Sequence, residues 1–406
     1  MGKYTETLED FSYGIDPGED GYEEMLEKAA GSFRPFDVAL TAFLTENGMI
    51  GEAATPDEVL RYITDAFKAA GIEPPRNRKK WFSVHASIKR KTAFEMCFAL
   101  RLDEDQADDF FRRVCLERGF DGHDMTEIVW LYAIRNGLTY EEALRIQKKL
   151  PTVKTDQKLA TGQVIYTQMI QSEIAEISSE EELIRYLTER ASSFGYNNAT
   201  ATRFIRELWD EIAGEDGLAY RERRDFHSGY EEDVESYGRT DSRVKIRVEK
   251  DDSLWDVYLQ ILGLSHIDMK QLGTDRSLKP ILKDRDLLHP LAEDSFPDRD
   301  GLNKILRGEH VSHERVRKIL ILLVFYRYWV RLLLKNRSYA VNGGEMARLE
   351  QTINNYLVDC GYPTLYIGNP YDWVILYSLV NSDTPLMTFR GFMQELYYRS
   401  FEGDRE

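Results

Sequence analysis

The chain has 406 residues, of which 42% are hydrophobic and 12% aromatic, and its formal net charge is -17. The hydrophobic content excludes a disordered chain, and the length suggests roughly two to four domains. The negative charge repels phosphate backbones and anionic membranes at long range, so any nucleic-acid surface has to be a local basic patch.

The charge is unevenly distributed along the chain. Residues 1–70 contain 15 acidic residues and 5 Lys or Arg, whereas residues 76–91 contain seven Lys or Arg and no acidic residue. We therefore expect an acidic, flexible N-terminus at 1–21 and a locally basic surface at 76–91. The polar start of the chain is unlike a secretion signal, and three cysteines without CxxC spacing predict free thiols in a reducing cytoplasm.

Helical periodicity and capping signals predict an all-α, multi-domain protein of short helices that form helix-turn-helix-like hairpins. Helix starts are expected at Thr55, Asp103, Thr139 and Ser179, and a helix break is expected at Arg34-Pro35. After the N-terminus, the predicted units are an N-terminal helical domain at 22–150, a middle helical segment with a charged loop at 151–243, and a C-terminal helical domain at 244–406.

The basic segment Arg76–Lys91 interleaves cations with Trp81, Phe82 and His85. Basic residues suit phosphates, and aromatic rings suit stacked bases. The predicted phosphate-contacting residues are Arg76, Arg78, Lys79, Lys80, Lys89 and Arg90. The following residues, KTAFEMCFALRLDEDQADDFFRRV at 91–114, resemble the closing helices of the lambda-repressor-like (XRE) helix-turn-helix family. The alternative is a solvated loop that balances the acidic N-terminal residues.

The charged loop expected at 214–243 contains Arg221 and His227 in an Arg-x5-His spacing. This spacing is similar to the loose signature of HEPN ribonucleases, which are helical. The resemblance implies a ribonuclease as a further alternative. Val244–Val248, which alternates apolar and basic residues, predicts one short strand.

The segment Leu291–Leu306, LAEDSFPDRDGLNKIL, resembles the helix-turn-helix of the same XRE family, with a turn at Ser295-Phe296-Pro297 and an inner pair Leu302/Ile305. Arg307-Gly308-Glu309 is similar to the family's helix-ending pattern. The resemblance implies a recognition helix whose exposed residues read the major groove. The residues expected to face nucleic acid are Arg299, Asn303, Lys304, Arg307, Arg315 and Arg317. Asp298 and Asp300 add negative charge at the same place.

The run Ile319–Leu334 is the most apolar stretch of the chain, yet it contains Arg327 and Arg331. A membrane span needs about 20 apolar residues with few charges, so we expect a buried core helix and no membrane contact. The two arginines are four residues apart and should share one helix face. The aromatic residues that crowd 362–398 are also expected to form core.

No cysteine, histidine and carboxylate spacing fits a zinc site, and no Gly-rich phosphate loop follows a strand. We therefore expect neither metal nor cofactor. The favoured hypothesis is a non-enzymatic, cytoplasmic, regulatory protein that binds DNA or RNA. The rival is a protein–protein adaptor or inhibitor whose acidic surface engages a basic, nucleic-acid-handling partner. An oligomer remains open, because the apolar run could also form a dimer seam.

Overall fold

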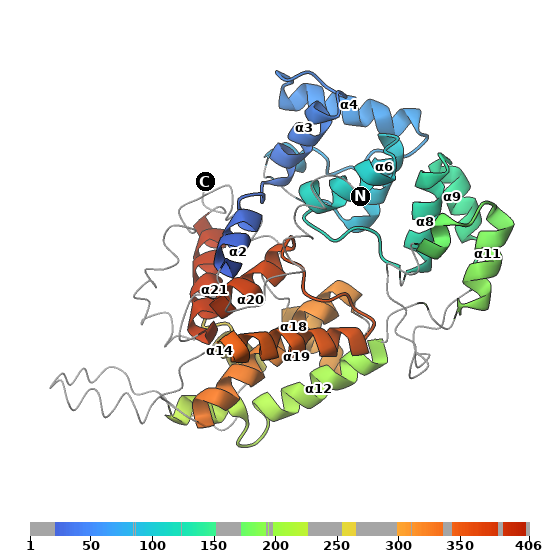
Figure 1. Cartoon of the computed structure of the whole chain (residues 1–406). Coiled ribbons are helices and arrows are strands. Elements are labelled where there is room, and N and C mark those ends of the chain that lie inside the picture. The colour runs from blue at the N-terminus through green and yellow to red at the C-terminus, as the bar shows by residue number, and fades with distance from the viewer. Residues whose placement is uncertain are drawn as a thin grey trace.

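The computed structural model describes residues 21–83, 85, 87–122, 124–151, 172–191, 194, 198–225, 254–264, 299–309, 311–335, 343–380 and 385–402. Every element within these ranges is a helix, which confirms the predicted all-α class (Figure 1). The predicted strand at 244–248 lies outside the described residues.

Two hydrophobic cores divide the described chain into two lobes. The N-lobe is formed by α3 (Phe36–Glu46), α4 (Pro56–Ala69), α5 (Lys80–Ser83), α6 (Arg90–Ala99), α7 (Glu104–Asp109), the π-helical turn η1 (Phe110–Val114), α8 (Met125–Arg135), α9 (Tyr140–Gln147) and α11 (Glu180–Glu189). The C-lobe is formed by α2 (Tyr22–Ala30), α12 (Asn198–Ala213), α14 (Leu254–Ile261), α17 (Arg299–Arg307), α18 (His313–Lys335), α19 (Gly343–Asp359), α20 (Pro370–Val380) and α21 (Pro385–Glu402).

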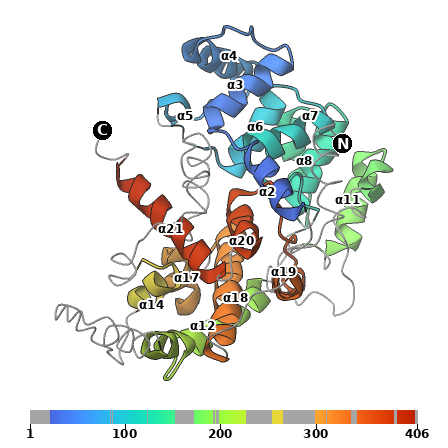
Figure 2. The same ribbon diagram turned by 60° about the vertical axis from the view of Figure 1, so that its left-hand side comes forward.

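The first helix, α2, belongs to the C-lobe although it precedes the whole N-lobe in sequence. It lies beside α20 in both ribbon views (Figures 1 and 2). The indole Nε1 of Trp373 donates a hydrogen bond to the Leu26 carbonyl at 2.8 Å, and the Phe33 ring meets the Trp373 ring edge to face. The α2 helix is therefore anchored on the C-terminal core, and the chain crosses to the N-lobe between Gly31 and Pro35.

The residues that share each core do not follow the predicted domain boundaries. Helix α11 packs on the N-lobe core through Leu183 and Leu187, whereas α12 packs on α18 in the C-lobe. The predicted middle segment is thus split between the lobes. The two amphipathic helices each bury their apolar faces, but sequence periodicity does not reveal which core receives each face.

Local capping signals are confirmed at several helix starts. Thr55 and Thr139 form reciprocal capping boxes with the glutamates three residues later, and Asp103 does so with Gln106. Ser179 accepts from the Glu182 amide, and the chain breaks its helix before Pro35 as expected. These signals act over three or four residues, so the sequence alone carries them.

Helix α18 is the central element of the C-lobe. Its residues from Ile319 to Phe325 are all buried, and it contacts α12, α17, α19 and α21. Arg327 and Arg331 share one face as predicted, since both pair with Glu211 of α12. None of the described helices, α18 included, is long and apolar enough to span a membrane. The buried C-terminal aromatics are core, as predicted: Tyr362, Tyr371, Trp373, Tyr377, Phe389 and Phe392.

Candidate nucleic-acid interface and the charge network between the lobes

The basic segment 76–91 is held on the N-lobe by its aromatic residue. Trp81 is 1% exposed, and its ring meets Phe36 of α3 edge to face. Arg78 donates from Nε to the Thr64 hydroxyl at 3.0 Å and from an Nη to the Pro75 carbonyl at 3.0 Å. The predicted role of Trp81 in base stacking is therefore wrong for this conformation, because the indole faces the core.

Five cations of this segment are exposed, and one of them, Lys91, pairs with Glu95. Arg76, Lys79, Lys80 and Lys89 are exposed, and none of them forms an ion pair with any described residue. The Nδ1 of His85 lies 2.6 Å from the Asp37 carboxylate, so this ring already has a polar partner within the N-lobe. The result is a turn and a short helix that present positive charge in an otherwise acidic chain.

Arg90 departs from the sequence prediction that it faces a phosphate. Its guanidinium donates to both carboxylate oxygens of Glu127 at 2.5 and 2.7 Å and to Glu117 at 2.7 Å. It also donates to the carbonyls of Arg118 and Gly119. Burial raises the pKa of the Glu127 carboxyl, although the charge of Arg90 opposes that shift. Because these acceptors take up the guanidinium donors, Arg90 is a structural residue that connects α6 to α8.

Helix α17 has the inward face that the helix-turn-helix register predicts. Leu302 and Ile305 are buried, while Lys304 and Arg307 are exposed and Asn303 is half-buried. The helix ends at Arg307, and Gly308 adopts a φ of 79°, a left-handed conformation that favours glycine. Arg299 is the first residue of the helix, and its side chain lies outside the described residues, as does the hairpin predicted at 285–298.

Arg315 and Arg317 follow on α18 and behave differently. Arg315 is exposed, whereas the Arg317 side chain is 6% exposed. The Arg317 guanidinium donates to both oxygens of Asp372 at 2.8 and 2.6 Å and to the Thr364 carbonyl at 3.2 Å. The prediction that Arg317 faces nucleic acid is therefore corrected, because its charge is neutralised inside the C-lobe.

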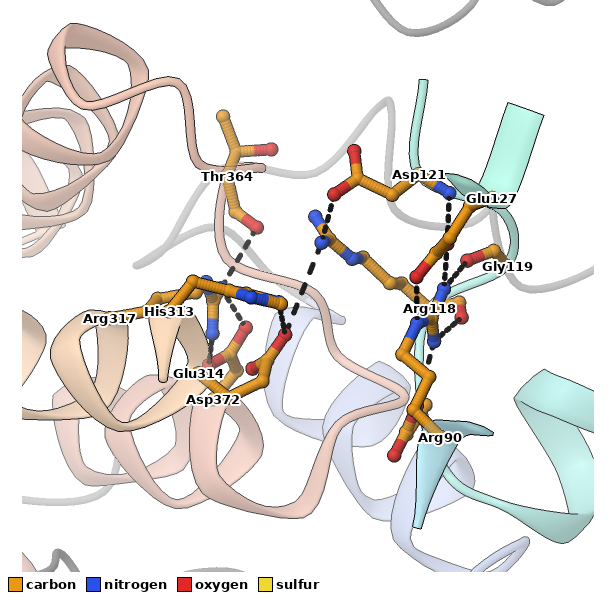
Figure 3. A network of polar contacts seen from close by, with 11 residues as sticks. Arg90, Arg118, Gly119, Asp121, Glu127, His313, Glu314, Arg317, Thr364 and Asp372 are labelled. Carbon is orange, nitrogen blue, oxygen red and sulfur yellow. Dashed lines mark hydrogen bonds and ion pairs between the residues drawn. The ribbon is translucent and has the colours of Figure 1, made fainter. Parts of the chain in front are cut away.

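These buried pairs belong to a larger network at the junction of the lobes (Figure 3). Arg118 extends from the N-lobe, donating to Asp121 at 2.7 Å and lying 4.0 Å from Glu314 at the start of α18. Glu314 also lies 3.2 Å from His313. The network thus runs from Arg90, which donates to the Arg118 carbonyl, through the Arg118 side chain to Glu314, whose charge interacts electrostatically with Arg317.

No family model, curated protein or solved structure matches this chain. Its function is therefore inferred from the geometry of its own residues. In the described parts of the chain, no group of three or more histidine, cysteine or carboxylate side chains could hold a metal ion. The three cysteines are free; Cys97 and Cys360 are buried, and Cys115 is partly buried.

The candidate ribonuclease segment is helical up to residue 225, although the sequence predicts a loop there. Arg221 is exposed on this helix, and His227 lies outside the described residues. The neighbouring Glu222 faces the C-lobe interior, where it accepts hydrogen bonds from Arg390, the Tyr326 hydroxyl and the Gln260 amide. This polar cluster stabilises the C-lobe by joining three helices to the 218–225 segment.

The Glu222 cluster should make the free energy of unfolding depend on pH. Burial opposes ionisation of Glu222, but Arg390, Tyr326 and Gln260 outweigh it and hold the pKa of this carboxyl below its ordinary value of 4.5. A lowered pKa in the folded state contributes stability above pH 4.5, and this contribution is lost as the pH falls through the folded pKa. We expect the stability difference between wild type and Glu222→Gln, measured by urea unfolding, to narrow below pH 4.5. A difference that stays constant across this range would contradict the assignment.

The sequence analysis missed the carboxylates that neutralise the buried arginines. Glu127 is the one acidic residue in the apolar helix MTEIVWLYAIR, and Asp372 is the one acidic residue in PYDWVILYSLV. A lone carboxylate in an otherwise apolar helix indicates a buried ion pair, because a buried charge without a partner is costly. This signal could have identified both acids, though not their partners.

Proposed function

We propose that this protein binds nucleic acid through the basic segment 76–91, by contacts to the phosphate backbone. The observation that carries the proposal is the exposed set Arg76, Lys79, Lys80 and Lys89, which have no carboxylate partner among the described residues. A protein with a net charge of -17 repels polyanions at long range, so unpaired surface cations in one segment favour a local contact with an anionic polymer.

The proposed contact is largely independent of base sequence. Lysines meet phosphates as point charges, and phosphate contacts position a protein without reading bases. The burial of Trp81 removes the main stacking platform from this surface. Its anchoring by Phe36 instead holds the backbone of the segment in place, which lowers the entropy cost of presenting the four cations together.

A second contact through α17 and the start of α18 is part of the proposal. The exposed Lys304 and Arg307 and the half-buried Asn303 lie on α17, whose inner residues Leu302 and Ile305 face the core, and the exposed Arg315 lies at the start of α18. This arrangement supports a recognition helix in the manner of the XRE family. The α5 and α17 helices belong to different lobes, so the two surfaces contribute to binding separately (Figure 2).

Salt-dependent binding tests the proposal. The four cations of segment 76–91 should contribute about -3.6 to the log–log salt slope on duplex DNA, from roughly -0.9 per phosphate contact. The variant Lys79→Ala/Lys80→Ala should weaken binding and reduce the magnitude of the slope by about 1.8, for duplexes of any sequence. Fluorescence anisotropy with labelled DNA and RNA, measured at several salt concentrations, gives both quantities.

The matched control is Lys148→Ala/Lys149→Ala, a second pair of adjacent exposed lysines directly after α9 of the N-lobe. Lys149 pairs with Glu180, so this pair is already partly neutralised, and its removal should leave the slope unchanged. Lys304→Ala/Arg307→Ala examines the second surface in the same assay. Absence of binding at about 50 mM salt, where backbone contacts are strongest, would exclude the proposal and favour the adaptor hypothesis.

A further inference from the structure

The two lobes meet at a short segment of the N-lobe, residues 112–121, which follows the middle of η1. Arg112 lies over the ring of Tyr366, with its guanidinium carbon 5.4 Å from the centroid. Leu116 is buried with the residues of the C-lobe core rather than with its own lobe. Arg118 then approaches Glu314. One segment therefore supplies an aromatic, an apolar and an ionic contact to the other lobe.

The charge network is strong inside each lobe and weak between them. Arg90 with Glu127, and Arg317 with Asp372, are short, bidentate and nearly buried pairs that each lie within one lobe. Arg118 and Glu314 are 4.0 Å apart, and the Glu314 side chain is 46% exposed. The Arg118 side chain is 19% exposed, so the pair is only partly open to solvent. A partly exposed pair at this distance contributes less than a buried bidentate pair and is screened by salt, whereas removal of one partner of a buried pair is costly.

The backbone of the same segment is strained. Leu116 adopts a φ of 52°, a left-handed conformation that is unfavourable for a residue with a β-carbon. The preceding turn is π-helical, with the Cys115 amide donating to the Phe110 carbonyl, and the Glu117 amide then donates to the Phe111 carbonyl. A β-carbon at Gly119 would lie 2.0 Å from the Asp108 carboxylate, so a larger residue here would displace that side chain. Such strain persists only where surrounding contacts hold it.

We propose that residues 112–121 form a releasable latch between the lobes, with Arg118–Glu314 as its ionic contact and Leu116 as its apolar contact. The contacts to the C-lobe hold the first part of the segment in its strained conformation, and the hydrogen bonds from Arg90 anchor residues 117–119 on the N-lobe. Release of the ion pair lets the segment relax and the lobes change their relative position, while each lobe keeps its own buried pairs. Small interfaces between domains of one chain permit such motion.

The variant Glu314→Lys tests the latch in the full-length protein, because it places a second cation opposite Arg118. We expect the Cys115 and Glu117 amides, which donate to Phe110 and Phe111, to exchange hydrogen about fivefold faster or more. Small-angle X-ray scattering should show a larger radius of gyration. The core amides of α18, beyond its first turn, should keep their protection, which distinguishes release of the latch from unfolding of the C-lobe.

The matched control is Glu207→Lys, which reverses another exposed glutamate of the C-lobe that pairs with an arginine, Arg203, on its own helix. This variant should leave both measurements unchanged. A second test needs no substitution: in wild type, salt raised from about 50 mM to about 1 M shortens the Debye length to about 3 Å and should speed exchange at the same two amides. Equal exchange and scattering in Glu314→Lys and wild type, or in low and high salt, would overturn the latch.

Discussion

Replacement of Arg317 by alanine is expected to lower the free energy of unfolding by about 3–5 kcal/mol, because it leaves a buried carboxylate without its counter-ion. Asp372 is 1% exposed and accepts both guanidinium hydrogen bonds. One of its oxygens also accepts from the Tyr366 amide at 2.9 Å. The loss therefore disturbs the start of α20 and the 364–366 turn as well as α18.

Urea unfolding of wild type and variant, followed by tryptophan fluorescence, measures this loss. The control is Arg315→Ala, two residues away on the same helix but exposed, which should cost less than about 1 kcal/mol. The double variant Arg317→Met/Asp372→Leu should recover part of the loss, since it removes both charges together. Recovery should be incomplete, because the Tyr366 amide and the Thr364 carbonyl then lose their partners. Equal stability of Arg317→Ala and Arg315→Ala would show that the pair is unimportant.

The substitutions of Arg315 and Arg317 also distinguish a structural role from a role in nucleic-acid binding. Arg315 and Arg317 look alike in sequence, since each stands in a basic stretch that opens a helix. In the fold one faces solvent and the other faces Asp372. Under conditions where it is folded, Arg317→Ala should retain nucleic-acid affinity, whereas Arg315→Ala should lower it if α18 takes part in the second contact.

Features encoded within a few residues could be predicted from the sequence. The capping boxes at Thr55 and Thr139, the break before Pro35 and the glycine end of α17 each depend on neighbouring residues alone. The buried face of α18 follows from its composition. These signals were sufficient for the all-α class and for many helix boundaries.

Long-range pairings could not be predicted in the same way. Arg317 and Asp372 are 55 residues apart, and Glu222 and Arg390 are 168 residues apart. Their pairing depends on which helices meet in the fold, and a charged residue in a basic or acidic run is ordinarily solvated. The attachment of α2 to the C-lobe has the same origin, because its apolar face would fit either core.

The candidate interface illustrates both situations. The sequence identified the basic segment 76–91 from composition, and five of its seven Lys and Arg are exposed. The sequence does not show that Lys89 and Arg90 have different environments. Lys89 is exposed, whereas Arg90 forms ion pairs with Glu117 and Glu127. Trp81 was assigned to the surface for the same reason, since nothing in the segment indicates that Phe36 receives the ring.

Substitution of Arg90 should therefore lower the stability of the fold, whereas substitution of Lys89 should weaken nucleic-acid binding. Arg90→Ala removes the shared partner of Glu127 and Glu117 and frees the carbonyls of residues 118 and 119, so we expect a loss of about 3–5 kcal/mol in the free energy of unfolding. Arg90→Lys should restore little of it, because one ammonium cannot replace a planar fork that contacts four residues. Urea unfolding and hydrogen exchange at residues 117–127 measure both effects.

Lys89→Ala is the matched comparison, because it removes a neighbouring cation that is exposed and forms no ion pair with a described residue. It should leave the free energy of unfolding within about 0.5 kcal/mol of wild type. It should also reduce the magnitude of the salt slope of nucleic-acid binding by about 0.9, the contribution of one phosphate. The opposite pattern, a stable Arg90→Ala with weakened binding beside an unstable Lys89→Ala, would mean that the buried clamp and the exposed surface have been assigned to the wrong residues.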